Sequence, residues 1–309
     1  MAQNYFYDYY QRNLLNKLIF KAGLSGIHQE INEKFKAEVL LFKPDVVWVF
    51  KGMELFPQSL LWAKNEGIKL VNYNTDNPFV FSGKGSGNKN VTDSIPLYDL
   101  HLTYDTTVKR KFEMEWKLPA GMLPFGFDLD DDLYKKCEQE PERGKACFLG
   151  NPDVFRGRFL QTLAENGIQL DLYGNDWAKF VLHPNIRIFA PVYGDEFWMV
   201  LRKYRLQLNL MRPHNPDTHN MRTFEVPGIG GILLAPSTVD HQQNFILGEE
   251  IFIYSDLPDC IIQIKKITGL SKEAADQIRR NARSRSLQSG YQYKDRADLA
   301  LELIKGVVE

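Results

Sequence analysis

Short apolar runs alternate with helix-length amphipathic stretches along most of the chain. This alternation is typical of parallel βαβ units, in which buried strands are continuous apolar runs and each connecting helix carries one apolar face. The pattern therefore predicts an α/β fold. The apolar runs predict strands at 45–50, 68–74, 100–104, 122–126, 146–150, 168–173, 186–189, 206–210, 231–235 and 251–254. The amphipathic stretches predict helices at 55–66, 106–116, 154–165, 195–203, 218–228, 257–268, 272–288 and 293–307.

The length of the chain and one charged stretch indicate two domains. A chain of 309 residues is long for one compact core, so two α/β domains are expected. Residues 128–145 are dense in charge and poor in β-branched side chains, and we interpret them as the linker. We therefore expect Rossmann-like domains at 1–130 and 131–290, followed by a C-terminal helix within 291–309.

The first domain departs from the usual Rossmann order. Such a domain opens with a strand and a glycine turn, whereas helix-like sequence precedes the first predicted strand at Asp45. Either the domain is trimmed by one βα unit, or a weak strand lies near residues 5–10. The trimmed domain is the favoured explanation.

Charge and cysteine content narrow the classes of function. The 38 basic and 39 acidic side chains nearly cancel, which argues against a general binder of nucleic acid or of anionic membranes. The three cysteines are widely spaced and form no CxxC pair. Neither a zinc site nor a disulfide framework is therefore indicated, and a cytoplasmic location fits this composition.

The N-terminal stretch 1–24 is aromatic and amphipathic, but four charged side chains interrupt it. It lacks the apolar core of a signal peptide and the length of a transmembrane segment. A surface helix packed on a domain is the preferred interpretation, and contact with a membrane surface or a partner is the alternative.

The segment that says most about chemistry is 219–236, with the sequence HNMRTFEVPGIGGILLAP. It predicts a helix that carries Arg222 and Glu225, then a glycine-rich turn, then an apolar strand. In a doubly wound sheet such a glutamate faces the crevice where ligands bind. A carboxylate accepts hydrogen bonds from the vicinal hydroxyls of a ribose, and glycines let the backbone approach a ligand closely. An ordinary helix, turn and strand with a solvated glutamate is the alternative.

This segment resembles the donor-site signature of the GT-B glycosyltransferases, in which a glutamate precedes a glycine-rich turn and an apolar strand. It is especially similar to the CgeB-like (spore-maturation-type) branch, whose Arg-x-Phe-Glu core is matched by residues 222–225, RTFE. Residues 148–151, FLGN, and 172–177, LYGNDW, resemble the same branch. The resemblance implies two Rossmann-like domains facing across a cleft: an acceptor-side domain, then a donor domain. It also implies that the last helix crosses back onto the first domain.

The resemblance further implies a nucleoside diphosphate sugar as the donor substrate, with no bound cofactor. Glu225 suits the ribose, and arginines suit the diphosphate because a guanidinium binds phosphate oxygens bidentately. Arg156 and Arg158 are two residues apart on a predicted helix, so at most one is expected to reach the phosphate. The implied donor-binding residues are Gly150, Asn151, Arg156, Arg158, Gly174, Asn175, Arg222, Phe224, Glu225 and Gly230.

Three other residues near this segment have two interpretations each. The wider GT-B pattern has another glutamate eight positions before the one at 225, where this chain has Asp217. Asp217 could act through water, but Asp is also a favoured N-cap, and capping of the following helix is the preferred interpretation. His214 and His219 flank the segment and could touch phosphate or sugar, although a loop histidine is more often incidental.

Lys51 and Asp76 follow the first two predicted strands, so both are expected at the ligand-binding edge of the first sheet. Asp76 is the candidate general base for an acceptor hydroxyl; the alternative is that residues 76–78 only form a turn. No Asp-x-Asp flanked by an apolar strand indicates a metal–diphosphate site. Helix N-termini, backbone amides and arginines can bind the phosphates, so we expect metal-independent activity.

We therefore expect a glycosyltransferase that moves a sugar from a nucleoside diphosphate donor to an unidentified acceptor hydroxyl. A nucleotide-sugar epimerase of the same fold and a non-catalytic two-domain ligand-binding protein are the alternatives. An NAD-linked oxidoreductase is disfavoured because no GxGxxG follows an opening strand. The pattern leaves the nucleotide base, the sugar and the oligomeric state open.

Overall fold

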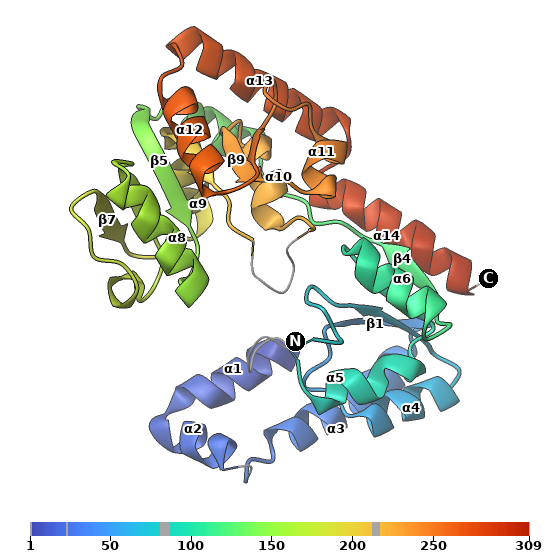
Figure 1. The fold of residues 1–309 in the computed structure, drawn as a ribbon. Coiled ribbons are helices and arrows are strands. Elements are labelled where there is room, and N and C mark those ends of the chain that lie inside the picture. Colours follow the sequence, from blue (N-terminus) through green and yellow to red (C-terminus); the bar gives the residue numbers. More distant parts are fainter. Residues whose placement is uncertain (1, 23, 81–86, 212–216, 309) are drawn as a thin grey trace. The chain divides into compact units, whose positions relative to one another are not determined.

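The computed structural model describes residues 2–22, 24–80, 87–211 and 217–308. The chain divides into two compact units, Met1–Pro124 with Leu299–Glu309, and Phe125–Asp298 (Figure 1). Each unit contains one parallel β-sheet with helices in its connections. The predicted α/β class with two Rossmann-like domains is therefore confirmed.

The sheet of the first unit has four parallel strands in the order β1-β2-β3-β4. No strand precedes β1 in the described part of the chain, and residues 5–10 lie in helix α1, so the weak strand considered there is wrong. In the described residues three helices, and no strand, precede β1. Its strands are β1 Val46–Phe50, β2 Lys69–Tyr73, β3 Leu100–Thr103 and β4 Ala120–Met122. Its helices are α1 Ala2–Arg12, α2 Leu14–Lys21, α3 Ile27–Phe42, α4 Pro57–Asn65, α5 Lys89–Ser94, the 3-10 turn Ile95–Leu97, and α6 Thr106–Met114.

Helices cover both faces of this sheet, and one of them comes from the end of the chain. Leu70 of β2 is buried on one face, in a cluster with residues of α3 and α4. The next residue, Val71, points to the other face, where α14 (Tyr293–Val308) supplies Ala300 and Ile304. The last turns of α14 are therefore part of the core of the first unit.

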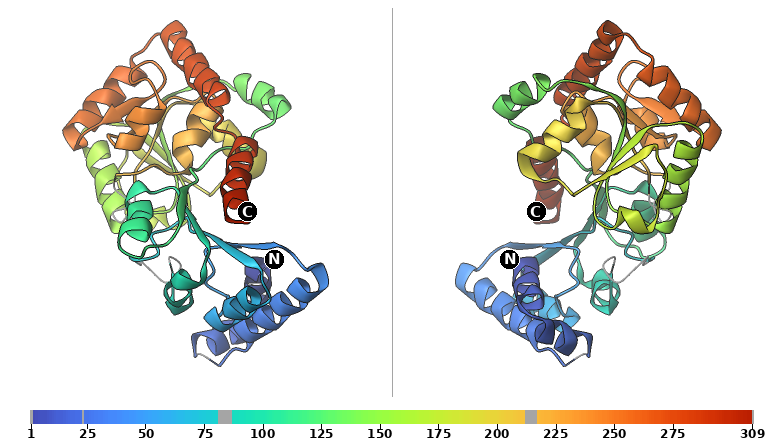
Figure 2. Two further views of the ribbon diagram at one scale, coloured as in Figure 1. Left: turned by 90° about the vertical axis from the view of Figure 1, so that its right-hand side faces the viewer. Right: turned by 90° about the vertical axis from the view of Figure 1, so that its left-hand side faces the viewer.

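The sheet of the second unit has six parallel strands in the order β10-β9-β8-β5-β6-β7. Figure 2 shows its strands between helices on either side. The chain starts at β5 in the middle, runs outward to β7, and returns to β8 on the other side of β5. Doubly wound sheets bind ligands where the winding reverses, which is here between β5 and β8. The strands are β5 Arg143–Leu149, β6 Leu170–Tyr173, β7 Ile186–Phe189, β8 Tyr204–Leu208, β9 Leu233–Pro236 and β10 Phe252–Tyr254.

Helices lie on both faces of this sheet as well. Leu160 and Ile264 are buried on one face, and Val200 and Val226 belong to clusters on the other. The helices are α7 Asp131–Glu138, α8 Val154–Glu165, the 3-10 turn Trp177–Lys179, α9 Gly194–Lys203, α10 Met221–Gly228, α11 Val239–Asn244, α12 Leu257–Thr268 and α13 Lys272–Gln288.

The charged stretch 128–145 is not a linker, and this prediction was wrong. The stretch contains α7 and the first residues of β5, and it lies inside the second unit. Asp130 caps α7, and Leu133 and Cys137 of the helix are buried in the core one turn apart, with Leu129 buried just before the cap. The helix therefore has a buried apolar side even though charged residues dominate its sequence.

The N-terminal stretch forms α1 and α2, which pack on the first unit. The rings of Phe6 and Phe20 contact each other and His28 of α3. In the described ranges of the chain, no helix has both the length and the apolar character that crossing a membrane requires.

Gly174 follows β6 in a conformation that favours glycine, with φ of 152°. An added Cβ would lie 2.3 Å from the carbonyl oxygen of Gly150, so the backbone would have to move. We expect Gly174→Ala to lower the free energy of unfolding by on the order of 3 kcal/mol or more. Gly167→Ala is the control, because its φ is also positive but nothing lies within 4 Å of the added Cβ. There we expect a loss of about 1–2 kcal/mol. Urea unfolding of both variants measures the difference, and equal losses would contradict it.

Candidate functional site

Arg156 donates hydrogen bonds to the backbone of the two segments that follow β5 and β8, on either side of the switch point. It lies in the first turn of α8, directly after β5, and is buried. Its guanidinium donates to the carbonyl oxygen of Asn151, after β5, at 3.1 Å, and to that of Leu210, after β8, at 2.9 Å. One side chain therefore holds the two segments that leave the central strands.

Arg158, two residues further along α8, has different surroundings. Asp153 caps the helix by accepting a hydrogen bond from the backbone N of Arg156, so the unpaired amides of the first turn lie just beyond the end of β5. Arg158 is exposed, whereas Arg156 is buried. Of these two arginines, Arg158 is the one that solvent reaches freely.

The ends of β5 and β6 lie close together because two glycines follow them. The backbone N of Gly150 donates to the carbonyl of Tyr173 at 3.0 Å, and no side chain on Gly174 separates the two segments. Asn151 and Asn175, the next residues, are both exposed. These four predicted donor-binding residues therefore share the carboxyl edge of the sheet with the start of α8.

Arg222 and Glu225 form an ion pair on α10. They are three residues apart, which puts them on the same side of the helix. The Glu225 side chain is only 8% exposed, and the Arg222 guanidinium also lies over the ring of Phe197, 4.6 Å from its centre. Burial raises the pKa of Glu225, and the charge of Arg222 opposes that rise. The charge of Arg222 thus stabilises the ionised Glu225 in a position that is largely excluded from water.

The rest of α10 is fixed by packing and by its glycine turn. Phe224 is fully buried and meets the ring of Tyr291 edge-on. At the end of the helix, Arg283 donates to the carbonyl of Gly228 at 2.5 Å, and Gly230 has φ of 68°. Phe224 and Gly230 therefore shape the helix and its turn in this structure, and both are buried.

Two side chains of α11 hold the start of α10, and the sequence pattern did not reveal them. Asp240 Oδ2 lies 2.6 Å from Nδ1 of His219, and Nε2 of His241 lies 2.9 Å from Oγ1 of Thr223. Both imidazoles are buried. A helix of six residues has fewer than two turns, so it shows too little periodicity to be recognised.

The hydrogen bonds of His241 define its protonation. Nδ1 lies 2.8 Å from the carbonyl oxygen of Pro236, which can only accept, so Nδ1 carries a proton and Nε2 accepts from the Thr223 hydroxyl. Burial lowers the pKa of His241 to about 4. The imidazole is therefore neutral at physiological pH, and protonation would abolish the acceptor that Thr223 uses.

Asp217 does not cap α10, contrary to the preferred interpretation. It is exposed, and the helix starts at Met221 with Asn220 as the N-cap. Both Asp and Asn are favoured N-cap residues, and the pattern alone did not distinguish the two positions. His214 lies outside the described residues.

In the first unit, Lys51 and Asp76 form an ion pair with 2.6 Å between Nζ and Oδ2. They follow the neighbouring parallel strands β1 and β2, at the carboxyl edge of that sheet. The turn after β2 is held by Asn74 and Asn77, whose side chains accept hydrogen bonds from nearby backbone N–H groups. The Asp76 carboxylate faces Lys51 instead of closing this turn.

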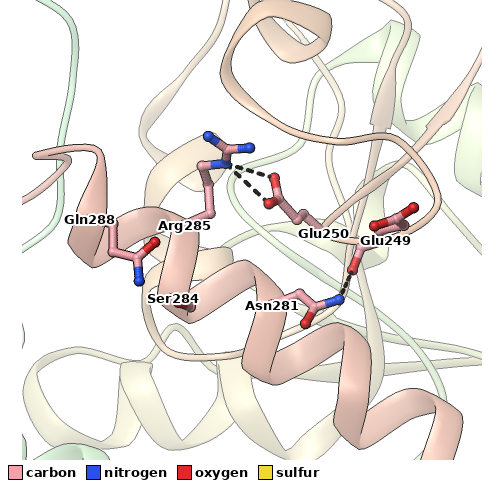
Figure 3. Close-up of a pocket in the computed structure, with 6 residues that line it drawn as sticks. All are labelled: Glu249, Glu250, Asn281, Ser284, Arg285 and Gln288. Atoms are coloured by element: carbon pink, nitrogen blue, oxygen red, sulfur yellow. Dashed lines mark hydrogen bonds and ion pairs between the residues drawn. The ribbon is translucent and has the colours of Figure 1, made fainter.

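A surface depression of about 320 Å³ lies beside α13 of the second unit (Figure 3). Arg285 donates to both carboxylate oxygens of Glu250 at 3.0 Å across it. Glu250 precedes β10, so the depression is at the amino edge of the sheet. In the ranges that the structure describes, no group of three or more His, Cys, Asp or Glu side chains could hold a metal ion. The depression is lined by Glu249, Glu250, Asn281, Ser284, Arg285 and Gln288.

Comparison with known families and structures adds to this geometry. Residues 156–302 match the family model described as glycosyl transferase-like. The matched residues cover most of the second unit, Phe125–Asp298. They include Arg156, Arg158, Arg222 and Glu225. Among curated proteins, none matches the chain significantly.

Solved structures share the fold of the whole chain. A sucrose-phosphate synthase from Thermosynechococcus elongatus is 12% identical with a TM-score of 0.64, covering 91% of this chain and 78% of that one. A UDP-forming α,α-trehalose-phosphate synthase from Burkholderia xenovorans is 14% identical with a TM-score of 0.64, covering 98% and 86%. Anabaena HepE in complex with UDP and glucose is 12% identical with a TM-score of 0.63, covering 91% and 82%. The fold is GT-B, and with the family match it supports an enzyme of the glycosyltransferase class.

The second unit should lose stability in mild acid because of His241. The pKa of His241, about 4 in the folded state, lies below the usual 6.5, so between these values the unfolded chain binds the extra proton. The neutral His241 contributes roughly 3 kcal/mol to the free energy of unfolding. This contribution is present in full above pH 6.5 and is lost as the pH falls toward 4. His241→Gln should therefore lose less stability on acidification than the parent. Thr223→Val, which keeps the histidine, should keep the acid sensitivity. Urea unfolding at pH 7, 6 and 5 tests this; an unchanged pH dependence in His241→Gln would refute it.

Proposed function

We propose that this protein transfers a sugar from a nucleoside diphosphate donor to an acceptor hydroxyl without a metal ion, as a CgeB-like member of the GT-B glycosyltransferases. The observation that supports this most is the ion pair between Arg222 and the buried Glu225 on α10. The pair lies within the residues that match the glycosyl transferase-like model, on the helix that follows switch-point strand β8. In this proposal the second unit binds the donor and the first unit binds the acceptor.

Glu225 is the proposed partner of the ribose. Its Oε2 bonds to Arg222, and no hydrogen bond from the described residues reaches Oε1. A ribose hydroxyl that donates to Oε1 would complete the partners of the carboxylate, and such charge-assisted bonds are strong where water is scarce. Arg222 supports this role because its charge favours the ionised carboxylate against the effect of burial.

The diphosphate is proposed to lie at the N-terminus of α8. Unpaired amides and the helix dipole attract anions there, and the exposed Asn151 leads into this turn. Arg158 is the proposed phosphate-binding cation, because the Arg156 guanidinium already donates to two carbonyl oxygens. Asn175, at the end of the neighbouring strand, is proposed to hydrogen-bond the sugar. HepE, whose structure holds UDP and glucose, shares this fold.

Asp76 is the proposed general base for the acceptor. Lys51 fixes one carboxylate oxygen at 2.6 Å, which orients the other toward an incoming hydroxyl. Asp217 and His219 have weaker support: Asp217 is exposed and could act through water, whereas His219 is buried and bonded to Asp240. Catalysis would come from positioning the reactants and from stabilising the leaving phosphate.

The products of the reaction distinguish this proposal from its alternatives. A thermal-shift panel of UDP, GDP, ADP, dTDP and their sugar conjugates identifies the donor, since a ligand at about 100 times its dissociation constant adds about 2.7 kcal/mol of stability. A transferase then releases the nucleoside diphosphate when an acceptor is added. An epimerase converts the free sugar nucleotide without releasing it, and a binding protein does neither.

Glu225→Gln should weaken binding of that nucleotide sugar while the fold stays intact. Loss of a charged hydrogen bond costs about 1.5–3 kcal/mol, which corresponds to about 10- to 150-fold in affinity. Glu302→Gln is the control, because Glu302 is an exposed glutamate on α14. Isothermal titration of the three proteins measures the change. Equal affinity in all three would remove Glu225 from the donor site.

Transfer should persist after treatment with EDTA. In the proposed site the phosphates are bound by Arg158 and by the amides at the start of α8, so no divalent cation is needed. The assay compares initial rates in EDTA with rates in added magnesium or manganese. Activity that disappears with EDTA and returns with either metal would show that the phosphates are bound in another way.

A further inference from the structure

The carboxyl end of β1 carries a large aromatic side chain that faces solvent. Phe50 is 61% exposed although it ends a strand of the sheet. Its ring stacks on Trp48, with 4.9 Å between ring centres, and meets Tyr73 of β2 edge-on at 5.7 Å. Two neighbouring rings therefore hold an exposed ring in place, at the edge of the sheet. Because the ring is already held in place, little conformational entropy is lost when a ligand packs on it.

The residue after this ring belongs to the Lys51–Asp76 ion pair. Both side chains are accessible, at 24% and 21%. Lys51 has φ of 59°, and the backbone N of Gly52 donates to the carbonyl of Phe50 at 2.7 Å, so Lys51 occupies the middle of a tight three-residue turn. A residue other than glycine at a positive φ costs on the order of 1 kcal/mol, and such backbone strain is concentrated at functional sites. This turn directly follows Phe50 in the chain and brings the Lys51 side chain to Asp76.

We propose that this aromatic and charged surface binds a saccharide, so that the acceptor is itself a sugar. The proposal rests on the proposed function and specifies its acceptor class. A pyranose has one face of C–H groups that can pack on the Phe50 ring. Its hydroxyls then donate to the Asp76 carboxylate and accept from the Lys51 ammonium.

The combination of groups favours a sugar over other hydroxyl acceptors. A flat exposed ring provides an apolar surface about the size of one pyranose, and the ion pair next to it supplies both a charged donor and a charged acceptor. A sugar, with vicinal hydroxyls at the rim of an apolar face, can use all three groups at once. A serine or threonine hydroxyl of a peptide offers one polar group and no such face.

Saturation-transfer NMR tests the proposal with four probes: the methyl glycosides of β-glucose, β-galactose, α-mannose and N-acetyl-β-glucosamine. The full chain is measured with and without the nucleotide that stabilises it most. We expect saturation of at least one glycoside. Phe50→Ala should weaken that binding roughly two- to tenfold, the range that corresponds to loss of a specific aromatic contact. The control is Phe42→Ala, which removes an 83% exposed ring at the end of α3.

The outcomes separate this inference from the proposed function. If no glycoside is saturated, or if Phe50→Ala and Phe42→Ala bind it equally well, the saccharide site is overturned even when the nucleotide binds. If glycoside binding depends on Phe50 but no nucleotide binds, the saccharide site stands and the proposed function fails. Circular dichroism of both variants shows that a loss of binding does not come from unfolding.

Discussion

The two hydrogen bonds from Arg156 to the carbonyls of Asn151 and Leu210 determine how the second sheet opens at its switch point. A guanidinium is planar and rigid, so its donors fix the separation of the loops that follow β5 and β8. The N-terminus of α8 and the chain that leads to α10 both start from these loops. The proposed phosphate and ribose sites therefore depend on one buried side chain that contacts neither ligand in the proposal.

The start of α10 shows how a costly buried charge is supported. A carboxylate that loses most of its water needs a counter-charge, and removing one member of such a pair leaves the other unpaired. Arg222 supplies that charge and lies over the ring of Phe197. Asp240 contacts His219 before the N-cap, and His241 contacts Thr223 in the first turn. Most of this support comes from α9 and α11, so the geometry of the pair depends on tertiary contacts more than on α10 itself.

The sequence determines some parts of this arrangement locally, and those parts could be predicted. The helix at 257–268 was predicted at its observed bounds because Asp256 caps it before a clear apolar periodicity. Strand β4 was placed too late, since the apolar run at 122–126 continues beyond Met122 and Phe125 belongs to the second unit. Arg222 and Glu225 carry a recognisable signature. The role of Arg156 has none, because its partners are backbone carbonyls, which every residue possesses.

The division of α14 between the two units has a consequence for synthesis on the ribosome. Ala300 and Ile304 complete one face of the first sheet, yet they follow the whole second unit in the sequence and are translated after it. Domains generally fold in the order in which they emerge. Here the N-terminal unit emerges first but lacks a covering helix until α14 emerges, and Val71 and Leu102 stay without that cover until then. The second unit, whose residues end at Asp298, has its full sequence earlier and is therefore the first that can finish folding.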